Sequence, residues 1–429
     1  MSYFLSLLGR GSSLPGSFAL KICPGLLSKL QLPPTIIAVT GSNGKTSTTE
    51  YIYELAKKTK KRVISNYEGS NQIEGITTLF ARNSTLKGKV KADIAIIESD
   101  ERFCQYTFSF FKPQYIVITN LFRDQMTRNG HNEYVYDELK KGLPLEATLV
   151  LNADDPLSAS YSKGREDVIF FGLDSFAFEE EDFSLVSKDS NYCIMCGAPL
   201  KYSSHIMYQL GHYYCSSCDY RREDTNHSVT SIINDKIVID GLYDIKPQML
   251  NQMFAANVVA AFTVGVEVFN LSEEVVSETL DGYVLKNDRV RRFHVASHNG
   301  LFMLSKHENT MAYNMSIRSI VKSKSKEKTV VIIFDLLSRK YIANDISWLW
   351  DVDFELLHNE RIVSIVVSGA FAYDLATRLI FAGVDEGIIH IIPDIKSMTD
   401  SLDKTAIGDI FAMTCFTDVK KFMTRVGEI

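Results

Sequence analysis

Thr40-Gly-Ser-Asn-Gly-Lys-Thr-Ser47 is the stretch that decides the fold. It follows the apolar run Ile36–Val39 and precedes a helical pattern over Thr48–Lys57, so the sequence predicts a strand, a phosphate-binding loop and a helix. The glycines allow a tight turn in which successive N–H groups and the helix N-terminus face phosphate oxygens. Lys45 is expected to reach the outer phosphates, and the Thr46 hydroxyl to ligate Mg²⁺.

This loop departs from the strict G-x-x-x-x-G-K-[ST] pattern, because Val39 stands where the first glycine is expected. The alternative is a glycine-rich turn with a solvated lysine, but the flanking strand and helix favour the phosphate loop. The residues expected to contact ATP here are Gly41, Ser42, Asn43, Gly44, Lys45, Thr46 and Ser47.

Composition places the chain among folded intracellular proteins. Its 429 residues are 45% hydrophobic and carry a net charge of −6, which predicts two or three packed domains and argues against nucleic acid as a partner. The apolar stretch near the start is interrupted by Arg10 and no apolar run is long enough for a membrane span, so we expect no signal peptide and a soluble protein of the cytoplasm.

Three further apolar runs are typical of buried parallel strands: Asp93–Ile97, Tyr115–Ile118 and Ala147–Leu151. Each delivers polar residues to one edge of a doubly wound sheet, where ligands bind. Glu98 follows the first run and is the candidate for a second Mg²⁺ ligand. The alternative is that Glu98–Glu101 is an ordinary solvated acidic turn.

Two motifs follow the other strands: Thr119-Asn-Leu-Phe-Arg-Asp-Gln125 and Leu151-Asn-Ala-Asp-Asp-Pro156. Together with the loop and Glu98 they resemble the central domain of the Mur ligases, and specifically the MurT branch. The resemblance implies an α/β fold with a P-loop domain and a smaller C-terminal α/β domain. It also implies that further residues lie near the nucleotide, namely Asn120, Asn152, Asp154 and Asp155.

Four cysteines form two C-x-x-C pairs, Cys193-Ile-Met-Cys196 and Cys215-Ser-Ser-Cys218, separated by eighteen residues. Two such knuckles complete a closed, all-sulfur tetrahedral site, which predicts structural zinc. The alternative is four reduced thiols without metal. An insert of this kind, at about residues 190–224, also resembles MurT and is absent from ordinary Mur ligases.

A long helical pattern over Met249–Phe269 carries Asn257. In Mur ligases an asparagine at the matching place approaches the adenine, so the resemblance implies that role for Asn257. Helix capping or packing is the alternative.

From about residue 295 a second α/β unit is expected, in which Asp345-Ile-Ser-Trp-Leu-Trp-Asp-Val-Asp-Phe-Glu355 is the strongest match to MurT. MurT works with GatD, a glutamine amidotransferase subunit whose Cys and His hydrolyse glutamine. The resemblance implies that Asp345 completes that triad by orienting the His. The alternative is that Asp345 only caps a helix.

The family amidates the α-carboxyl of D-glutamate in the peptidoglycan precursor lipid II, using ATP, Mg²⁺ and ammonia from GatD. We expect three parts of the chain: a lead-in at 1–34, the ATP-binding central domain at 35–290 and the C-terminal domain at 295–429. Because lipid II lies in the membrane, we expect the protein to have at most peripheral access to the membrane. Several substrate-side motifs depart from the family pattern: Phe371 stands in place of an arginine, and Tyr341–Ala343 in place of A-D-G. A divergent nucleotide-binding scaffold for an amidotransferase partner is therefore the second hypothesis, and the insert argues against a third, ligation of an amino acid without a partner.

Overall fold

The structure is a computed structural model that describes residues 12–67, 70–125, 129–174, 189–247, 252–286, 290–305, 308–335, 345–415, 419–424 and 426–428. These residues form two compact units. The first holds the described residues of 1–122, 132–183 and 188–287, and the second those of 123–131 and 288–429. The altered segment Tyr341–Ala343 lies outside the described residues.

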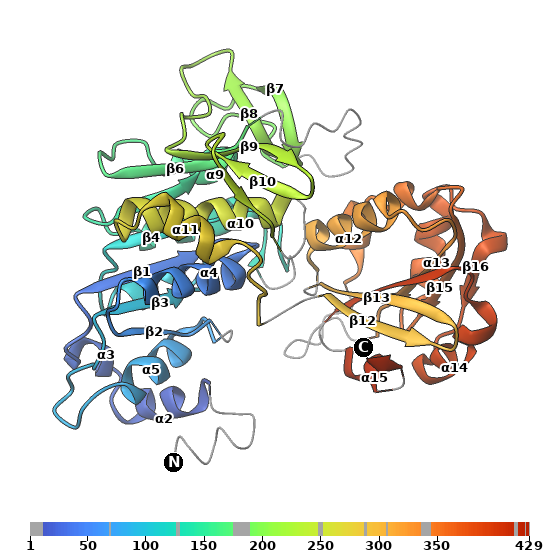
Figure 1. The fold of residues 1–429 in the computed structure, drawn as a ribbon, viewed down its shortest axis with the longest axis horizontal. Helices are drawn as coiled ribbons and strands as arrows, with labels where there is room; N and C mark the ends of the chain where they lie inside the picture. The colour runs from blue at the N-terminus through green and yellow to red at the C-terminus, as the bar shows by residue number, and fades with distance from the viewer. Residues whose placement is uncertain are drawn as a thin grey trace. The chain divides into compact units, whose positions relative to one another are not determined.

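The first unit is built on a sheet of nine described strands in the order β11-β10-β9-β6-β5-β4-β1-β3-β2 (Figure 1). From β2 to β9 neighbouring strands run parallel, and β10 is antiparallel to β9 and β11. The strands are β1 Thr35–Thr40, β2 Val63–Ser65, β3 Ile94–Glu98, β4 Tyr115–Ile118, β5 Thr148–Asn152, β6 Val168–Leu173, β9 His227–Ile233, β10 Lys236–Ile239 and β11 Tyr243–Ile245.

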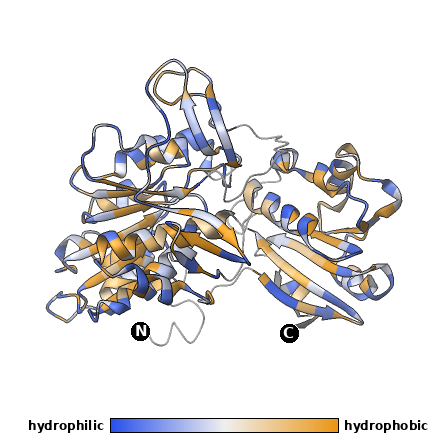
Figure 2. Cartoon of the chain, turned by 45° about the horizontal axis from the view of Figure 1, so that its top comes forward, coloured by the Kyte–Doolittle hydropathy of each residue, from blue (hydrophilic) through white to orange (hydrophobic). Residues whose placement is uncertain are grey.

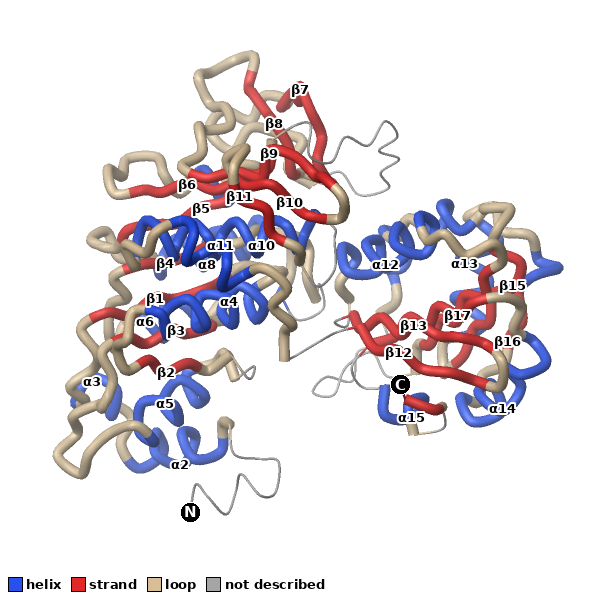
Figure 3. Tube along the Cα trace, in the orientation of Figure 1, coloured by secondary structure: helices blue, strands red, loops and turns tan. Residues whose placement is uncertain are grey.

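Helices flank this sheet on both sides (Figure 3). Alternate residues of a strand face opposite sides, so Ile36 and Ala38 of β1 join a core with Ile76 and Leu139, while α4 packs on β3 and α10 packs on α4 and β6. The helices are α2 Leu14–Ile22, α3 Leu26–Lys29, α4 Lys45–Lys58, α5 Ile73–Arg82, α6 Cys104–Phe108, α8 Asn132–Gly142, α9 Pro156–Ser160, α10 Gln252–Thr263 and α11 Glu273–Leu280.

Two local features of this unit refine the expectations. The phosphate-loop helix begins at Lys45, three residues earlier than the apolar pattern indicates, because Gly44 turns the chain directly into it. The expected helix Met249–Phe269 is described from Gln252, and α10 continues as a π-helical turn over Val264–Val268.

The four-cysteine insert contributes a separate two-stranded hairpin, β7 Leu200–Met207 and β8 Leu210–Cys215. The two strands are antiparallel, and we call this element the ribbon hairpin. Its base carries the cysteine pairs, and its turn, Tyr208 and Gln209, is buried in the first unit.

The second unit has a sheet in the order β16-β15-β14-β17-β13-β12-β18. From β16 to β13 neighbouring strands run parallel, and β12 is antiparallel to β13 and β18. Its elements are β12 Val290–Val295, β13 His298–Ser305, α12 Thr310–Lys322, β14 Lys328–Ile333, β15 Ile362–Ser368, α13 Ala372–Phe381, β16 Ile389–Ile391, α14 Ile395–Thr405, β17 Asp409–Cys415, α15 Val419–Met423 and β18 Gly427–Glu428.

The predicted α/β class is confirmed: both units have central, largely parallel strands rich in apolar residues, coloured orange in Figure 2. The buried runs expected at the sheet centre form β3, β4 and β5, and the second α/β unit expected from about residue 295 contains the parallel strands β14, β15 and β16. In the described part of the chain, no helix combines the length and apolarity needed to cross a membrane.

Candidate functional site

The phosphate loop lies between β1 and α4, and its shape depends on two glycines. Gly41 and Gly44 have φ values of 126° and 83°, in the left-handed region that other residues rarely adopt. A Cβ atom at Gly41 would collide with the side chain of Thr119, and one at Gly44 with Asn257. Thr119, after β4, and Asn257, in α10, therefore pack directly against the backbone of the two glycines.

The loop is fastened by the motif that follows β4. The Asn43 N–H donates to Asn120 Oδ1 (2.9 Å), and the Asn43 carbonyl accepts from Asn120 Nδ2 (3.1 Å) and from the Thr119 hydroxyl (2.6 Å). The Ser42 hydroxyl donates to the Phe122 carbonyl (2.9 Å) and accepts from the Phe122 N–H (3.0 Å). Since Asn120 already holds Asn43, its first role is to shape the loop.

Lys45 is the first residue of α4 and only 4% of its surface is exposed. Its Nζ forms an ion pair with Glu101 Oε2 at 2.8 Å and donates to the carbonyls of Gly41 and Ser42. Sequence reasoning missed Glu101, although its place in the acidic turn after β3 was an available signal. Thr46 and Ser47 follow in the first turn of α4 and are half-buried.

Glu98 is the last residue of β3 and pairs in register with Val39, the next-to-last residue of β1. It is 3% exposed. Oε1 accepts from Asn71 Nδ2 at 3.0 Å, and Asn66 bonds both the N–H and the carbonyl of Glu98. Oε2 is buried without a hydrogen-bond partner among the described residues. A buried carboxylate oxygen left in this state is suited to a cation, which argues against the solvated acidic turn.

The side chains of the motif after β5 are engaged with protein groups. Asn152 Nδ2 donates to the Thr119 carbonyl (2.9 Å), and Asp154 accepts from Arg222 Nε (2.8 Å). Asp155 Oδ2 accepts from the Leu121 N–H (2.7 Å).

Asp154 and Asp155 are fully buried. Burial raises the pKa of both carboxyls, opposed at Asp154 by Arg222, and brings the pKa of Asp155 to about 6. Their observed contacts are those of positioning residues, and direct contact with the nucleotide stays a prediction.

Asn257 lies inside α10 and is 3% exposed. Because it is not at the helix end, it is not a cap. Its side chain lies against Gly44 of the phosphate loop. The implied contact with adenine stays a prediction.

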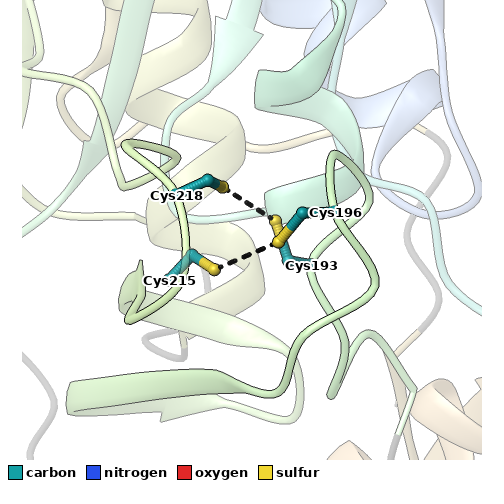
Figure 4. A group of neighbouring side chains, drawn as sticks. All are labelled: Cys193, Cys196, Cys215 and Cys218. Atoms are coloured by element: carbon teal, nitrogen blue, oxygen red, sulfur yellow. Dashed lines mark hydrogen bonds between the residues drawn. The ribbon is translucent and has the colours of Figure 1, made fainter.

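The four cysteines of the insert come together, with their Sγ atoms all within 4.8 Å of one another (Figure 4). Cys193 and Cys218 are 3.6 Å apart at sulfur, as are Cys196 and Cys215. A tetrahedral zinc site with Zn–S bonds of about 2.3 Å places sulfurs about 3.8 Å apart. The donor set and spacing therefore fit zinc.

Backbone groups shape each knuckle of this cluster. The Gly197 N–H donates to the Cys193 carbonyl (2.8 Å) with Gly197 at a φ of 74°. The Ser217 N–H donates to Cys215 Sγ (3.4 Å) and lowers the pKa of that thiol, whereas burial raises the pKa of the Cys193 thiol. A thiol held in this way is readily deprotonated, as a zinc ligand must be.

In the second unit, Asp345 is exposed and precedes a 3-10 turn over Ser347–Asp351. Its Oδ1 accepts from the Ser347 N–H (2.9 Å), and the Ser347 hydroxyl and N–H lower the pKa of the carboxyl. Asp345 is not the N-cap of this turn, which is Ile346. Its carboxylate is ionised and accessible, and its role toward a partner stays a prediction. Behind the turn, buried Arg378 donates to the carbonyls of Leu349 (3.2 Å) and Val352 (2.8 Å).

Comparison with known proteins assigns the family. A family profile described as Mur ligase middle domain matches residues 39–215, and one described as MurT ligase C-terminal matches residues 306–419. The lipid II isoglutaminyl synthase (glutamine-hydrolyzing) subunit MurT of Staphylococcus aureus is 31% identical over 391 residues, covering 89% of this chain and 85% of that protein. The chain belongs to the MurT branch of the Mur ligase family. The MurT subunit of Streptococcus pneumoniae is 29% identical and covers 98% of this chain and 93% of its own.

Solved structures agree on the fold of this MurT-family chain. A pseudomurein peptide ligase type C from Methanothermus fervidus matches 93% of this chain and 79% of its own, with a TM-score of 0.68 and 17% identity. MurF ligase from Thermotoga maritima, solved in complex with ADP, matches 96% of this chain and 83% of its own, with a TM-score of 0.61 and 15% identity. The predicted Mur ligase-like architecture is therefore confirmed.

Proposed function

We propose that this chain is the ATP-dependent amidating subunit of a lipid II isoglutaminyl synthase. The observation that carries the proposal is the closed phosphate loop with buried Lys45, together with Glu98 Oε2, which has no hydrogen-bond partner among the residues that the structure describes. These groups offer one site for an anionic triphosphate and one for its cation. The names of the MurT relatives supply the substrate class.

In the proposed reaction the α-carboxylate of D-glutamate attacks the γ-phosphorus of ATP, forming an acyl phosphate and releasing ADP. Ammonia then attacks the acyl carbon, phosphate leaves, and the amide forms after loss of a proton. Lys45 would exchange Glu101 for phosphate oxygens, and the loop N–H groups would hold the transferring phosphate. Mg²⁺, when held by Glu98 and Thr46, would neutralise charge on the phosphates.

Ammonia is proposed to come from a GatD-type glutaminase subunit bound by the second unit. Asp345 supports this assignment, because its carboxylate is exposed, ionised and held in one orientation by Ser347. Such a group is able to orient a histidine of a partner. We also assign structural Zn²⁺ to the cluster of Cys193, Cys196, Cys215 and Cys218, on the sulfur spacing given above.

A second candidate function is favoured by Phe371, which directly precedes α13 where the family pattern has an arginine. Phenylalanine offers neither charge nor a bidentate fork to a carboxylate or phosphate. A chain of this kind could bind nucleotide and a glutaminase while no longer amidating lipid II.

One experiment separates the two functions. This chain, purified with a GatD-type glutaminase, is incubated with lipid II, ATP and glutamine, and the mass of the product is measured by mass spectrometry. The amidating function predicts the mass change from carboxylic acid to primary amide, dependent on ATP. A stable complex that binds ATP and leaves lipid II unchanged would support the scaffold and overturn the first proposal.

A further inference from the structure

The turn of the ribbon hairpin is buried, although hairpin turns usually face solvent. Tyr208 adopts a left-handed φ of 53° and is 8% exposed, and Gln209 is 3% exposed. The Tyr208 ring makes an edge contact with Phe122, the residue that holds Ser42 in the phosphate loop. The insert therefore reaches the segment that shapes the nucleotide site.

Gln209 connects two loops at the carboxyl ends of β4 and β5. Its Nε2 donates to the Leu121 carbonyl at 2.7 Å and to Asp155 Oδ1 at 2.9 Å. Asp155 Oδ2 in turn accepts from the Leu121 N–H at 2.7 Å. Both backbone polar groups of Leu121 are thus held, one by each of these two side chains.

Leu121 lies between the two residues that fasten the phosphate loop. Asn120 bonds the N–H and carbonyl of Asn43, and Phe122 exchanges two hydrogen bonds with the Ser42 hydroxyl. A shift of Leu121 would therefore move both fastenings. A continuous set of hydrogen bonds leads from the hairpin turn to the backbone expected to bind phosphate.

The side-chain amide of Gln209 is held in one orientation by its two acceptors. Both acceptors, the Leu121 carbonyl and the Asp155 carboxylate, face its NH₂ group, while Oε1 is buried without a partner among the described residues. Leaving a buried acceptor unmet is costly. The buried Oε1 is the cost of an orientation in which both N–H groups of the Gln209 amide donate to Leu121 and Asp155.

We propose that Gln209 is a positioning residue for nucleotide binding, through which the four-cysteine insert braces the phosphate loop. The other contacts of the insert reinforce the brace: the Gly211 N–H donates to the Asp154 carbonyl at 3.0 Å, and the Tyr220 hydroxyl donates to the Pro156 carbonyl. Cys215 is the last residue of β8, so the cysteine cluster fixes the base of the same hairpin. This inference rests on the proposed binding of ATP at the phosphate loop.

The test is the affinity of the full chain for Mg-ADP, measured by isothermal titration calorimetry. In Gln209→Glu the NH₂ becomes an oxygen that opposes the Asp155 carboxylate and the Leu121 carbonyl, so we expect Mg-ADP to bind about tenfold more weakly. Lys201→Ala, at an exposed position of the same hairpin, is the matched control and should bind as the wild type does.

Two measurements distinguish a role of Gln209 in positioning the phosphate loop from a general loss of folded structure. Hydrogen exchange should rise at the Leu121 and Asn43 amides in Gln209→Glu while zinc content stays near that of the wild type. The binding deficit should also shrink as pH falls, because the introduced carboxyl group, once protonated, regains a donor toward Asp155. Gln209→Met, of similar volume and without donors, replaces Gln209→Glu if the latter does not fold.

Unchanged Mg-ADP affinity in the folded Gln209 variant would overturn this inference and leave the proposed function standing. A wild-type chain that binds no Mg-ADP would instead overturn the proposed nucleotide site, and the inference with it.

Discussion

The phosphate loop of the first unit and the Asp345 segment of the second are built in opposite ways. Lys45, Glu98 and Asn120 are each less than 5% exposed and are surrounded by hydrogen bonds from their own unit. Asp345 is exposed, and Ser347 restrains it from within the chain. The first arrangement is largely complete before any ligand arrives, whereas the second presents one ionised group outward.

This difference indicates how the two regions acquire function. A buried polar site must satisfy its groups internally or with a bound ion. Oε2 of Glu98 has no partner in the described part of the chain, and this points to a ligand that enters the first unit. An exposed carboxylate has no such requirement, because water solvates it. Its proposed role comes from the geometry of a second protein. The predictions below test this contrast, beginning with the largest effect.

Lys45→Ala should lower ATP-dependent amidation about a thousandfold with either glutamine or free ammonia as the nitrogen source, since it removes the charge that faces the phosphates. Amide formation by the complex is followed by mass spectrometry. Lys57→Ala, at a half-exposed position on the same helix, is the control and should retain full activity. Comparable activity in Lys45→Ala would show that phosphate transfer does not use this loop.

Asp345→Asn should lower glutamine-dependent amidation about a hundredfold while leaving ammonia-dependent amidation near the wild-type rate, because only the orientation of the partner's histidine is affected. The same assay with the two nitrogen sources measures the split. Asp400→Asn, on an exposed face of α14, is the matched control. Equal loss with both nitrogen sources would indicate that Asp345 supports the structure of the second unit and does not orient a histidine of the partner.

The same contrast explains what sequence could predict. The loop, the strand ends and the cysteine pairs are local patterns with a fixed period or spacing, so their fold and grouping could be predicted. The Lys45–Glu101 ion pair and the contact of Gln209 with Leu121 join residues 56 and 88 positions apart. No local sequence pattern predicts these contacts, because they form only when the fold brings the ends of β3 and β4 close to the phosphate loop and to the ribbon hairpin.

Asp154 and Asp155 show the complementary limit. Their motif was recognisable, but the role of each oxygen depends on distant donors such as Arg222 and Gln209. The residue types alone could not distinguish contact with a nucleotide from support of the loops around it.

Loss of the cysteine cluster should affect the first unit alone. Cys215→Ser removes one of four thiolates, so we expect loss of bound zinc and a fall of about 5 °C in the melting temperature of the first unit. Metal content and differential scanning calorimetry measure these effects. Cys23→Ser, outside the cluster and half-buried, should retain both. Unchanged zinc in Cys215→Ser would contradict an all-cysteine site.

The smallest effect concerns a polar cluster of the first unit away from the phosphate loop. His227 Nδ1 lies 2.6 Å from Asp240 Oδ2, and Nε2 lies 3.2 Å from Glu267 Oε1. Burial lowers the pKa of His227, but the hydrogen bonds and charges of the two carboxylates outweigh it, and the net pKa is raised. The stabilisation is therefore full below the unfolded pKa of about 6.5 and is lost as pH rises through the folded value.

His227→Gln should thus lower the free energy of unfolding by about 0.5 kcal/mol more at pH 6 than at pH 9, a small effect because both carboxylates are partly solvated. Urea denaturation at the two pH values measures the difference, with His294→Gln, on an exposed position of β12, as control. Mg-ADP affinity should not change, since neither carboxylate contacts the phosphate-loop motif in the described structure. A larger loss at pH 9 would contradict the raised pKa and mean that His227 is held neutral.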